Sequence, residues 1–288
     1  MQLFEKSRSI VAFIDILGFK EIVKANDKSK DNFLLYQLKD ALQQSFNKSI
    51  IVMEQWLSAI DKIENKNFAS KLKYRQFSDN LYFSFDYNDD KSDYELAVYL
   101  ITMMSAYYQR IMLSKNFYVR GGIADGKNYF DEHIIFSGAL IKAYEFETKT
   151  AKYPRIIIDK KILKSLPKDN FIKKVLPNIF VKDWAGLVFL NPFKIITSLT
   201  DMFAQYPEII PKLDKIAKGN PSLLNASTTL NLEPDILDGV LTELVWDNLK
   251  VKLKKHKYQP ELYEKNLWLR EFVDWQDDYE SNLNFKYC

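Results

Sequence analysis

Two aspartates are the residues in this sequence best suited to chemistry. Asp15 interrupts the apolar run SIVAFIDIL at residues 9–17, and Asp79 lies in a turn between two β-favouring segments. A carboxylate inside an otherwise buried strand needs a cation, because an unpaired buried charge is costly. If the two side chains converge, their oxygens suit Mg²⁺ or Mn²⁺, which can activate a hydroxyl group and neutralise a phosphate leaving group. The alternative is structural: Asp15 caps the turn at Gly18, and Asp79 forms an Asx turn.

Glycine and arginine near these aspartates suit a phosphate group. Gly18 and Phe19 follow the first apolar run, where a turn without a side chain lets backbone N–H groups approach a triphosphate. Arg120 could hold a phosphate or stabilise a transition state, and the alternative is a surface salt bridge. The segment GGIADGK at 121–127 fits seven positions of a Walker A pattern, but Asn128 replaces the Ser or Thr that holds the metal. We therefore expect a hairpin turn in this segment.

Arg75 and Phe77 suit the recognition of a base. Alternate residues of a strand point to the same face, so these two side chains share one. An arginine can donate hydrogen bonds to a base carbonyl while the aromatic ring stacks on the base. The alternative is a core aromatic residue beside a solvated arginine. A basic cluster, VKLKKHK at 251–257, is interpreted as a solvated helix face rather than as a nucleic-acid or membrane contact.

Composition excludes several classes of function. The chain has 288 residues, with 41 Lys and Arg against 38 Asp and Glu, so no global field favours nucleic acid or an anionic membrane as a partner. The single cysteine, Cys288, cannot form an internal disulfide, and two distant histidines leave little material for a zinc site or a serine–histidine mechanism. No signal peptide or membrane span is recognisable, so we expect a cytoplasmic protein.

The pattern of elements predicts an α+β fold. We expect a strand at 9–17, two helices within 20–66, a hairpin formed by 72–77 and 81–87, and a helix at 91–114. Strands at 117–124 and 127–136, a helix from 138, a strand at 155–159 and a last strand at 186–193 follow. This order contains the β-α-β-β-α-β arrangement of a ferredoxin-like sheet, with helices expected on one face. We predict a catalytic domain at 1–193 and a helical extension at 194–288.

Several segments together resemble class III nucleotidyl cyclases. FIDILGF resembles their first metal motif and RQFSDN their second, while VRGGIADG, SGALIKAYEFE and YPRIIID are similar to later segments, so the likeness covers residues 9–159. The resemblance implies a palm-like catalytic domain and two Mn²⁺ or Mg²⁺ ions held by Asp15, the Ile16 carbonyl and Asp79. It also implies a homodimer in which each active site takes side chains from both subunits.

Within that class the sequence motifs are most similar to those of the Pycsar cyclases, bacterial anti-phage enzymes that make cyclic UMP or cyclic CMP. Their base-reading motif, Arg or Tyr, any residue, then Trp, compares with Arg75-Gln76-Phe77. The resemblance implies UTP, or less readily CTP, as the substrate, and an effector reached only through the cyclic nucleotide. The residues placed at the nucleotide are Gly18, Phe19, Tyr74, Arg75, Phe77 and Ser78.

The resemblance breaks down on the helix after Gly138. Purine cyclases carry an Asn and a transition-state Arg there, where this sequence offers Ile141 or Lys142, and Glu145 or Phe146. Arg120 or Lys142 would have to substitute for the missing arginine. Two other functions therefore stay open: a non-catalytic nucleotide sensor, and a palm-type nucleotidyltransferase that makes an oligonucleotide or a cyclic dinucleotide.

Overall fold

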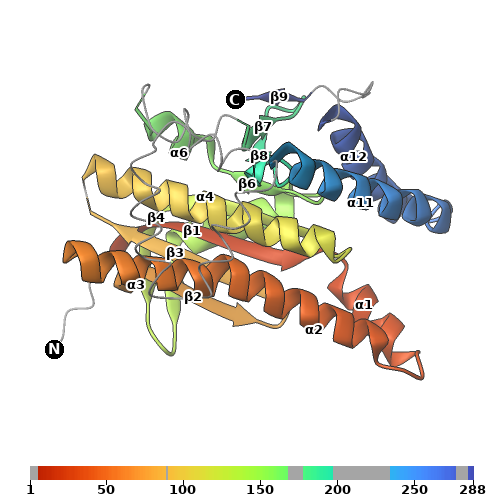
Figure 1. The fold of residues 1–288 in the computed structure, drawn as a ribbon, viewed down its shortest axis with the longest axis horizontal. Coiled ribbons are helices and arrows are strands. Elements are labelled where there is room, and N and C mark those ends of the chain that lie inside the picture. Colours follow the sequence, from red (N-terminus) through yellow and green to blue (C-terminus); the bar gives the residue numbers. More distant parts are fainter. Residues whose placement is uncertain (1–5, 89, 168–177, 197–233, 277–284) are drawn as a thin grey trace.

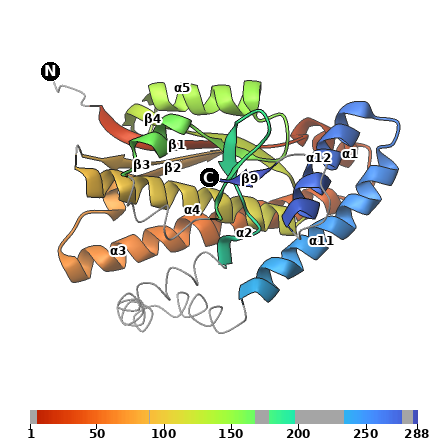
Figure 2. The same cartoon turned by 90° about the horizontal axis from the view of Figure 1, so that it is seen from above.

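The computed structural model describes residues 6–88, 90–167, 178–196, 234–276 and 285–288. A nine-stranded sheet runs through the molecule in the order β2-β3-β1-β4-β6-β8-β7-β9, and β5 pairs with β4. Helices lie on both sides of this sheet (Figures 1 and 2). No described helix has the length and apolar character needed to cross a membrane.

Four antiparallel strands form the first part of the sheet. They are β1 (Ser7–Ile16), β2 (Leu72–Phe77), β3 (Asn80–Tyr87) and β4 (Val119–Phe130). Helices separate β1 from β2 and β3 from β4, and the spatial order is β2-β3-β1-β4 with every neighbour antiparallel. The predicted α+β class and β-α-β-β-α-β arrangement are therefore confirmed.

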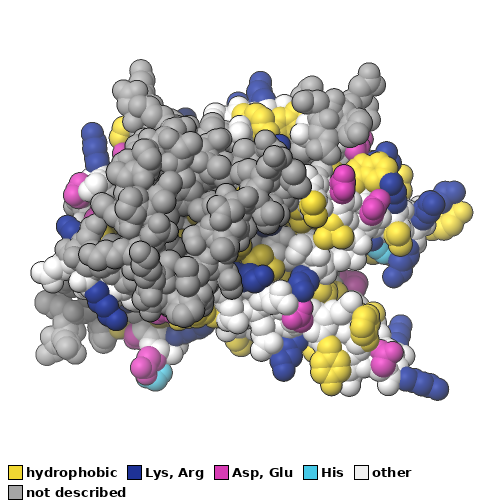
Figure 3. Space-filling view, in the orientation of Figure 1, with side chains coloured by type: hydrophobic (Ala, Val, Ile, Leu, Met, Phe, Trp, Pro, Cys, Tyr) yellow, Lys and Arg dark blue, Asp and Glu magenta, His cyan; other side chains and the backbone are white. Residues whose placement is uncertain are grey.

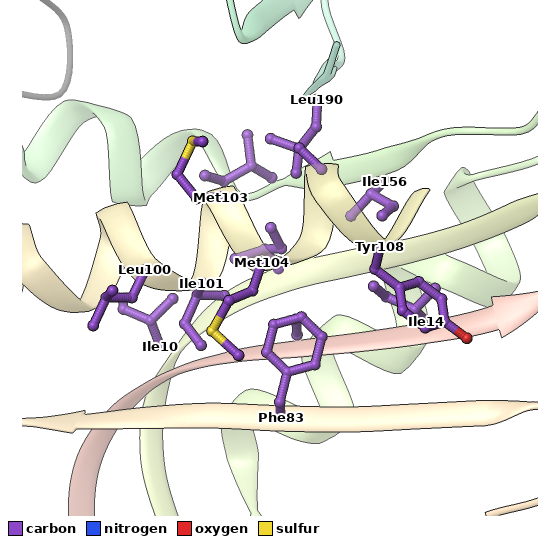
Figure 4. Close-up of a cluster of buried hydrophobic side chains, with 14 of the residues drawn as sticks. Ile10, Ile14, Phe83, Leu100, Ile101, Met103, Met104, Tyr108, Ile156 and Leu190 are labelled. Atoms are coloured by element: carbon purple, nitrogen blue, oxygen red, sulfur yellow. The ribbon is translucent and has the colours of Figure 1, made fainter. Parts of the chain in front are cut away.

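One face of these strands is covered by the long helix α4 (Lys91–Ser114), and α2 (Phe33–Phe46) packs against α4. The chain also forms α1 (Phe19–Asp27), which contacts α2, and α3 (Val52–Glu64), and a π-helical turn, η1 (Asn47–Ile51), joins α2 to α3. A short 3-10 helix, η2 (Ala69–Lys71), precedes β2. Methionine, leucine and isoleucine side chains of α4 pack onto alternate residues of β1 and β3 (Figure 4). This burial of apolar surface is the main stabilising contribution to the layer.

Helix α5 (Gly138–Glu145) covers the opposite face, so the prediction that helices lie on one face only is wrong. The physical reason is that β1 is apolar on both sides: Val11 and Ala12 point to opposite faces, and both are fully buried. Ala139 and Ala143 are small enough to bring α5 close to the sheet. A π-helical turn, η3 (Phe146–Thr150), continues α5.

The segment at 117–136 folds differently from the prediction of two strands with a turn at 121–127. β4 is one continuous strand, and only β5 (Ile135–Ser137) turns back on it. The glycines that suggested a turn serve close packing instead. A Cβ atom at Gly121 would lie 2.6 Å from the Phe13 carbonyl oxygen, so only glycine fits beside β1.

The C-terminal part of the chain shares a second hydrophobic core with the sheet. Its elements are β6 (Ile156–Ile158), α6 (Lys160–Ser165), β7 (Phe180–Lys182), β8 (Val188–Leu190), α11 (Pro234–Lys255), α12 (Pro260–Gln276) and β9 (Lys286–Tyr287). Phe189 of β8 packs against Trp268 and Phe272 of α12. Arg110 of α4 also forms a 2.6 Å ion pair with Asp238 of α11.

The helical character predicted for 194–288 holds for α11 and α12, and much of the remainder of that range lies outside the described residues. The division at residue 193 stays a prediction. The sequence analysis placed strands at 155–159 and 186–193, where β6 and β8 lie, but it missed β7 and β9.

Candidate active site

Asp15 and Asp79 come together at one end of the antiparallel sheet. Asp15 is paired with Asn80 across β1 and β3, and Asp79 directly precedes Asn80 in the two-residue loop that joins β2 to β3. The two carboxyl groups are close enough to share a hydrogen bond. The sequence separated these residues by 64 positions, and the hairpin brings them into contact.

A basic and a third acidic side chain complete this cluster. Arg120 lies opposite Asp15 in the register of β1 and β4, and its Nη2 atom is 3.4 Å from Asp15 Oδ2. The Nε atom of the same guanidinium is 2.6 Å from Glu147 Oε1. Two carboxylates therefore contact this guanidinium, and Asp79 lies beside one of them as a third acidic group.

Burial and mutual repulsion shift the acids in this cluster. Burial is the largest cause that raises the pKa of Asp15, to about 7, followed by the hydrogen bond with Asp79 and the charge of Glu147. Arg120 acts against this shift. Burial also raises the pKa of Glu147, and Arg120 is the largest opposing influence. A bound cation would stabilise the ionised form of a carboxyl group whose pKa is raised in this way.

The turn after β1 supplies backbone donors near the cluster. Ile16 ends β1, Gly18 adopts a left-handed conformation with φ of 83°, and Phe19 begins α1. Glycine tolerates this conformation without strain and has no side chain to cap the helix. The first N–H groups of α1 are therefore suited to an anion.

The β2–β3 hairpin presents Arg75, Phe77 and Ser78 beside the aspartates. Arg75 and Phe77 share the face of Asp15, as the registers require, and Phe77 is 75% exposed. Ser78 adopts a left-handed conformation at the tip, with φ of 54°. Arg75 donates a 2.6 Å hydrogen bond to the Asp131 carbonyl and lies 4.9 Å from the centre of the Phe130 ring.

Two predicted site residues are not brought to this cluster. The side chain of Tyr74 lies on the helical face of the sheet, where its hydroxyl donates a 2.9 Å hydrogen bond to Glu54 of α3. Its neighbours on β2 point the other way because side chains alternate along a strand. Lys142 of α5 forms an ion pair with Asp159, the N-cap residue of α6.

Glu147 is the site residue that the sequence analysis missed. A signal was present, because Glu147 stands four residues after Ala143 and eight after Ala139, and all three are buried against the sheet. An acidic residue at such a spacing belongs to the packed face, where it requires a partner.

The donor atoms in the cluster fit a divalent cation of the Mg²⁺ or Mn²⁺ type. Asp15 and Asp79 supply carboxylate oxygens, which these ions prefer, and a cation between them would relieve the repulsion that raises the pKa of Asp15. The described residues contain no cluster of three or more acidic, histidine or cysteine side chains arranged as a complete metal site. Further ligands would therefore come from substrate and water.

No protein-family model matches this chain, and no curated protein sequence matches it. Among solved structures, the guanylyl cyclase Cya2 is similar over 65% of this chain and 91% of its own, at 13% identity and a TM-score of 0.34. A class III adenylyl cyclase-like ATP-binding protein from Pseudomonas aeruginosa is similar over 67% of this chain and 40% of its own, at 10% identity and a TM-score of 0.41.

A bacterial light-regulated adenylyl cyclase is similar over 65% of this chain and 52% of its own, at 12% identity and a TM-score of 0.32. At these identities and TM-scores, the chemistry of the site has to be inferred from its own residues.

Proposed function

We propose that this protein is a nucleotidyl cyclase that converts UTP, or less readily CTP, into the 3′,5′-cyclic monophosphate and pyrophosphate. The observation that carries the proposal is the contact between Asp15 and Asp79 beside Arg120, at one end of a β-α-β-β-α-β sheet. The resemblance of the segments around these residues to the metal motifs of class III cyclases supports the same reaction.

Asp15, Asp79 and the Ile16 carbonyl would hold two Mg²⁺ or Mn²⁺ ions. When bound, such ions lower the pKa of the ribose 3′-hydroxyl and neutralise charge on the phosphates. The chain's own groups position the substrate: the N–H groups at Gly18 and Phe19 bind the phosphates, and Arg120 donates hydrogen bonds to them. The 3′-hydroxyl loses its proton to water, and its oxygen bonds to the α-phosphorus as the bond to pyrophosphate breaks, a reaction that depends on positioning and charge stabilisation.

Arg75 would recognise the base. A guanidinium group only donates hydrogen bonds, so it suits the carbonyl oxygens of uracil better than the amino group of cytosine. Phe77, with its exposed ring two residues along the same strand face, would stack on the base. Lys142, which is paired with Asp159, is not part of this proposal.

The protein would act as a homodimer in the cytoplasm. Exposed apolar side chains on the face of the site, Phe77, Ile141 and Tyr144, suit contact with a second chain. The product would reach its effector as a diffusible signal, in the role of anti-phage defence that the resemblance implies. Residues 1–193 would carry catalysis, with 194–288 as a helical extension.

The direct test is incubation of the purified protein with Mn²⁺ and each of ATP, GTP, CTP and UTP, with products identified by mass and retention time. We expect cyclic UMP, and loss of that product in Asp15→Ala. Longer or dinucleotide products would instead assign a nucleotidyltransferase. Triphosphate binding without any product would assign a nucleotide sensor.

A further inference from the structure

Glu147 occupies a position that a carboxylate rarely takes without a role. It is only 2% exposed, and it lies in the π-helical turn that follows α5. This turn reaches β4 because Gly122 has no side chain: a Cβ atom there would lie 2.3 Å from the Ala143 carbonyl oxygen and 2.6 Å from Phe146 Cβ. The close approach places the Glu147 carboxylate against the Nε atom of Arg120.

The guanidinium of Arg120 is held by two carboxylates at unequal distances. Its Nε atom is 2.6 Å from Glu147 Oε1, whereas its Nη2 atom is 3.4 Å from Asp15 Oδ2. Glu147 is therefore the closer ion-pair partner, although only the longer contact with Asp15 has hydrogen-bond geometry. A cation bound by Asp15 would compete with the longer contact and leave the shorter one in place, because Glu147 grips the Nε side of the guanidinium.

We propose that Glu147 is a positioning residue that holds the Arg120 guanidinium beside Asp15, so that its Nη groups face the triphosphate of the substrate. This inference rests on the function proposed above. In this inference Glu147, a buried residue of the segment after α5, keeps Arg120 of β4 in one orientation. Glu147 itself contacts neither the substrate nor the metal ions.

The test measures binding of UTP in the presence of Ca²⁺, by calorimetry, separately from turnover. We expect Glu147→Gln and Arg120→Ala each to weaken UTP binding about tenfold, since each removes one oriented charge-assisted contact with the phosphates. The double variant should lose no more than either single variant, because both changes remove the same oriented guanidinium. The affinity for Mn²⁺ alone should stay within about threefold in Glu147→Gln.

Glu145→Gln is the matched control. It removes the same charge two residues earlier, from an exposed side chain that pairs with Lys149, and it should bind UTP as the unaltered protein does. Circular dichroism verifies that each variant is folded. If Glu147→Gln does not fold, Glu147→Asp keeps the charge but shortens the reach to Arg120, and it should lose part of the UTP affinity.

Normal UTP binding by the folded Glu147 variant would overturn the inference, as would a large loss of Mn²⁺ binding, which would make Glu147 a metal ligand. Additive losses in the double variant would also contradict it. Failure of the proposed function has a different signature: UTP binding would show the predicted coupling between Glu147 and Arg120, but the unaltered protein would form no cyclic product. Absence of triphosphate binding by the unaltered protein would overturn both.

Discussion

Asp15 and Arg120 face each other as direct partners in the register of β1 and β4, and 3.4 Å separates Oδ2 of the first from Nη2 of the second. The pairing gives the acidic cluster a built-in counter-charge. The chain can therefore fold around three neighbouring carboxylates before any metal ion binds, although the compensation is incomplete.

The incomplete compensation predicts a pH-dependent stability of the metal-free protein. The pKa of Asp15 is raised from 3.8 to about 7, so the folded state keeps a proton that the unfolded state releases. Stability should fall as the pH rises through this window, and the whole penalty is present above it. Asp15→Asn has no such penalty. At about pH 8 its free energy of unfolding, measured by urea titration, should therefore be at least ~1 kcal/mol higher than that of the original protein.

Below about pH 3 the two proteins should be equally stable, because Asp15 is then largely protonated in both states. Added Mn²⁺ should stabilise the original protein and not Asp15→Asn. Equal stability of the two at about pH 8 without metal would contradict the electrostatic description of the cluster.

Gly122→Ala should disturb the site through the backbone. The new Cβ would meet the Ala143 carbonyl oxygen at 2.3 Å, which forces α5 away from β4 and withdraws Glu147. We expect a loss of about 2 kcal/mol in stability, by thermal unfolding, and a lower rate of product formation. Gly138→Ala is the control, because nothing lies within 4 Å of its added methyl group, and the substitution should be harmless. Equal behaviour of the two variants would contradict this description.

Phe77→Ser should weaken the binding of UTP with little change in the stability of the fold. The ring is 75% exposed, so its removal should change the free energy of unfolding by less than about 0.5 kcal/mol. If the ring stacks on the base, the affinity for UTP should fall about fivefold or more, as titration calorimetry would measure. Phe33→Ser removes another exposed ring, on the projecting end of α1 and α2 where Figure 3 shows apolar side chains, and should leave UTP binding unchanged.

Arg155→Met should destabilise the C-terminal core. Arg155 and Asp183 form a buried 2.5 Å ion pair, and the guanidinium lies 5.3 Å from the centre of the Trp268 ring. Removal of the arginine leaves the Asp183 charge buried without this partner, which costs about 3 kcal/mol. Chemical denaturation would show the loss. Arg270→Met breaks a pair whose arginine is 45% exposed and should cost less than about 1 kcal/mol, so similar losses in both would refute the assignment.

Local sequence patterns predicted much of the site-bearing part of the fold. The apolar run around Asp15, the hairpin around Asp79 and the helix at 91–114 each have a periodicity that one element explains. The convergence of the two aspartates was predicted only for a hairpin that pairs antiparallel to the first strand, and β3 pairs with β1 in that way.

Prediction from local sequence patterns was wrong or incomplete where tertiary packing decides the structure. Gly121 and Gly122 resemble turn residues, but they lie inside β4 because neighbouring backbones approach them too closely for a Cβ atom. The spacing of Glu147 from Ala139 and Ala143 marks it as buried, but its role was missed because its partner, Arg120, lies on β4 and no local pattern reports the distance between them. β9 has two residues and pairs with β7, more than a hundred positions earlier, so periodicity could not reveal it.

The second core has a consequence for spectroscopy. Four of the five tryptophans, Trp184, Trp246, Trp268 and Trp275, belong to that core or contact Phe285 within it. Intrinsic emission excited at the indole band would therefore report largely on the packing of α11 and α12 against the sheet. Occupancy of the site calls for a labelled nucleotide, while indole emission becomes a separate gauge of the C-terminal half.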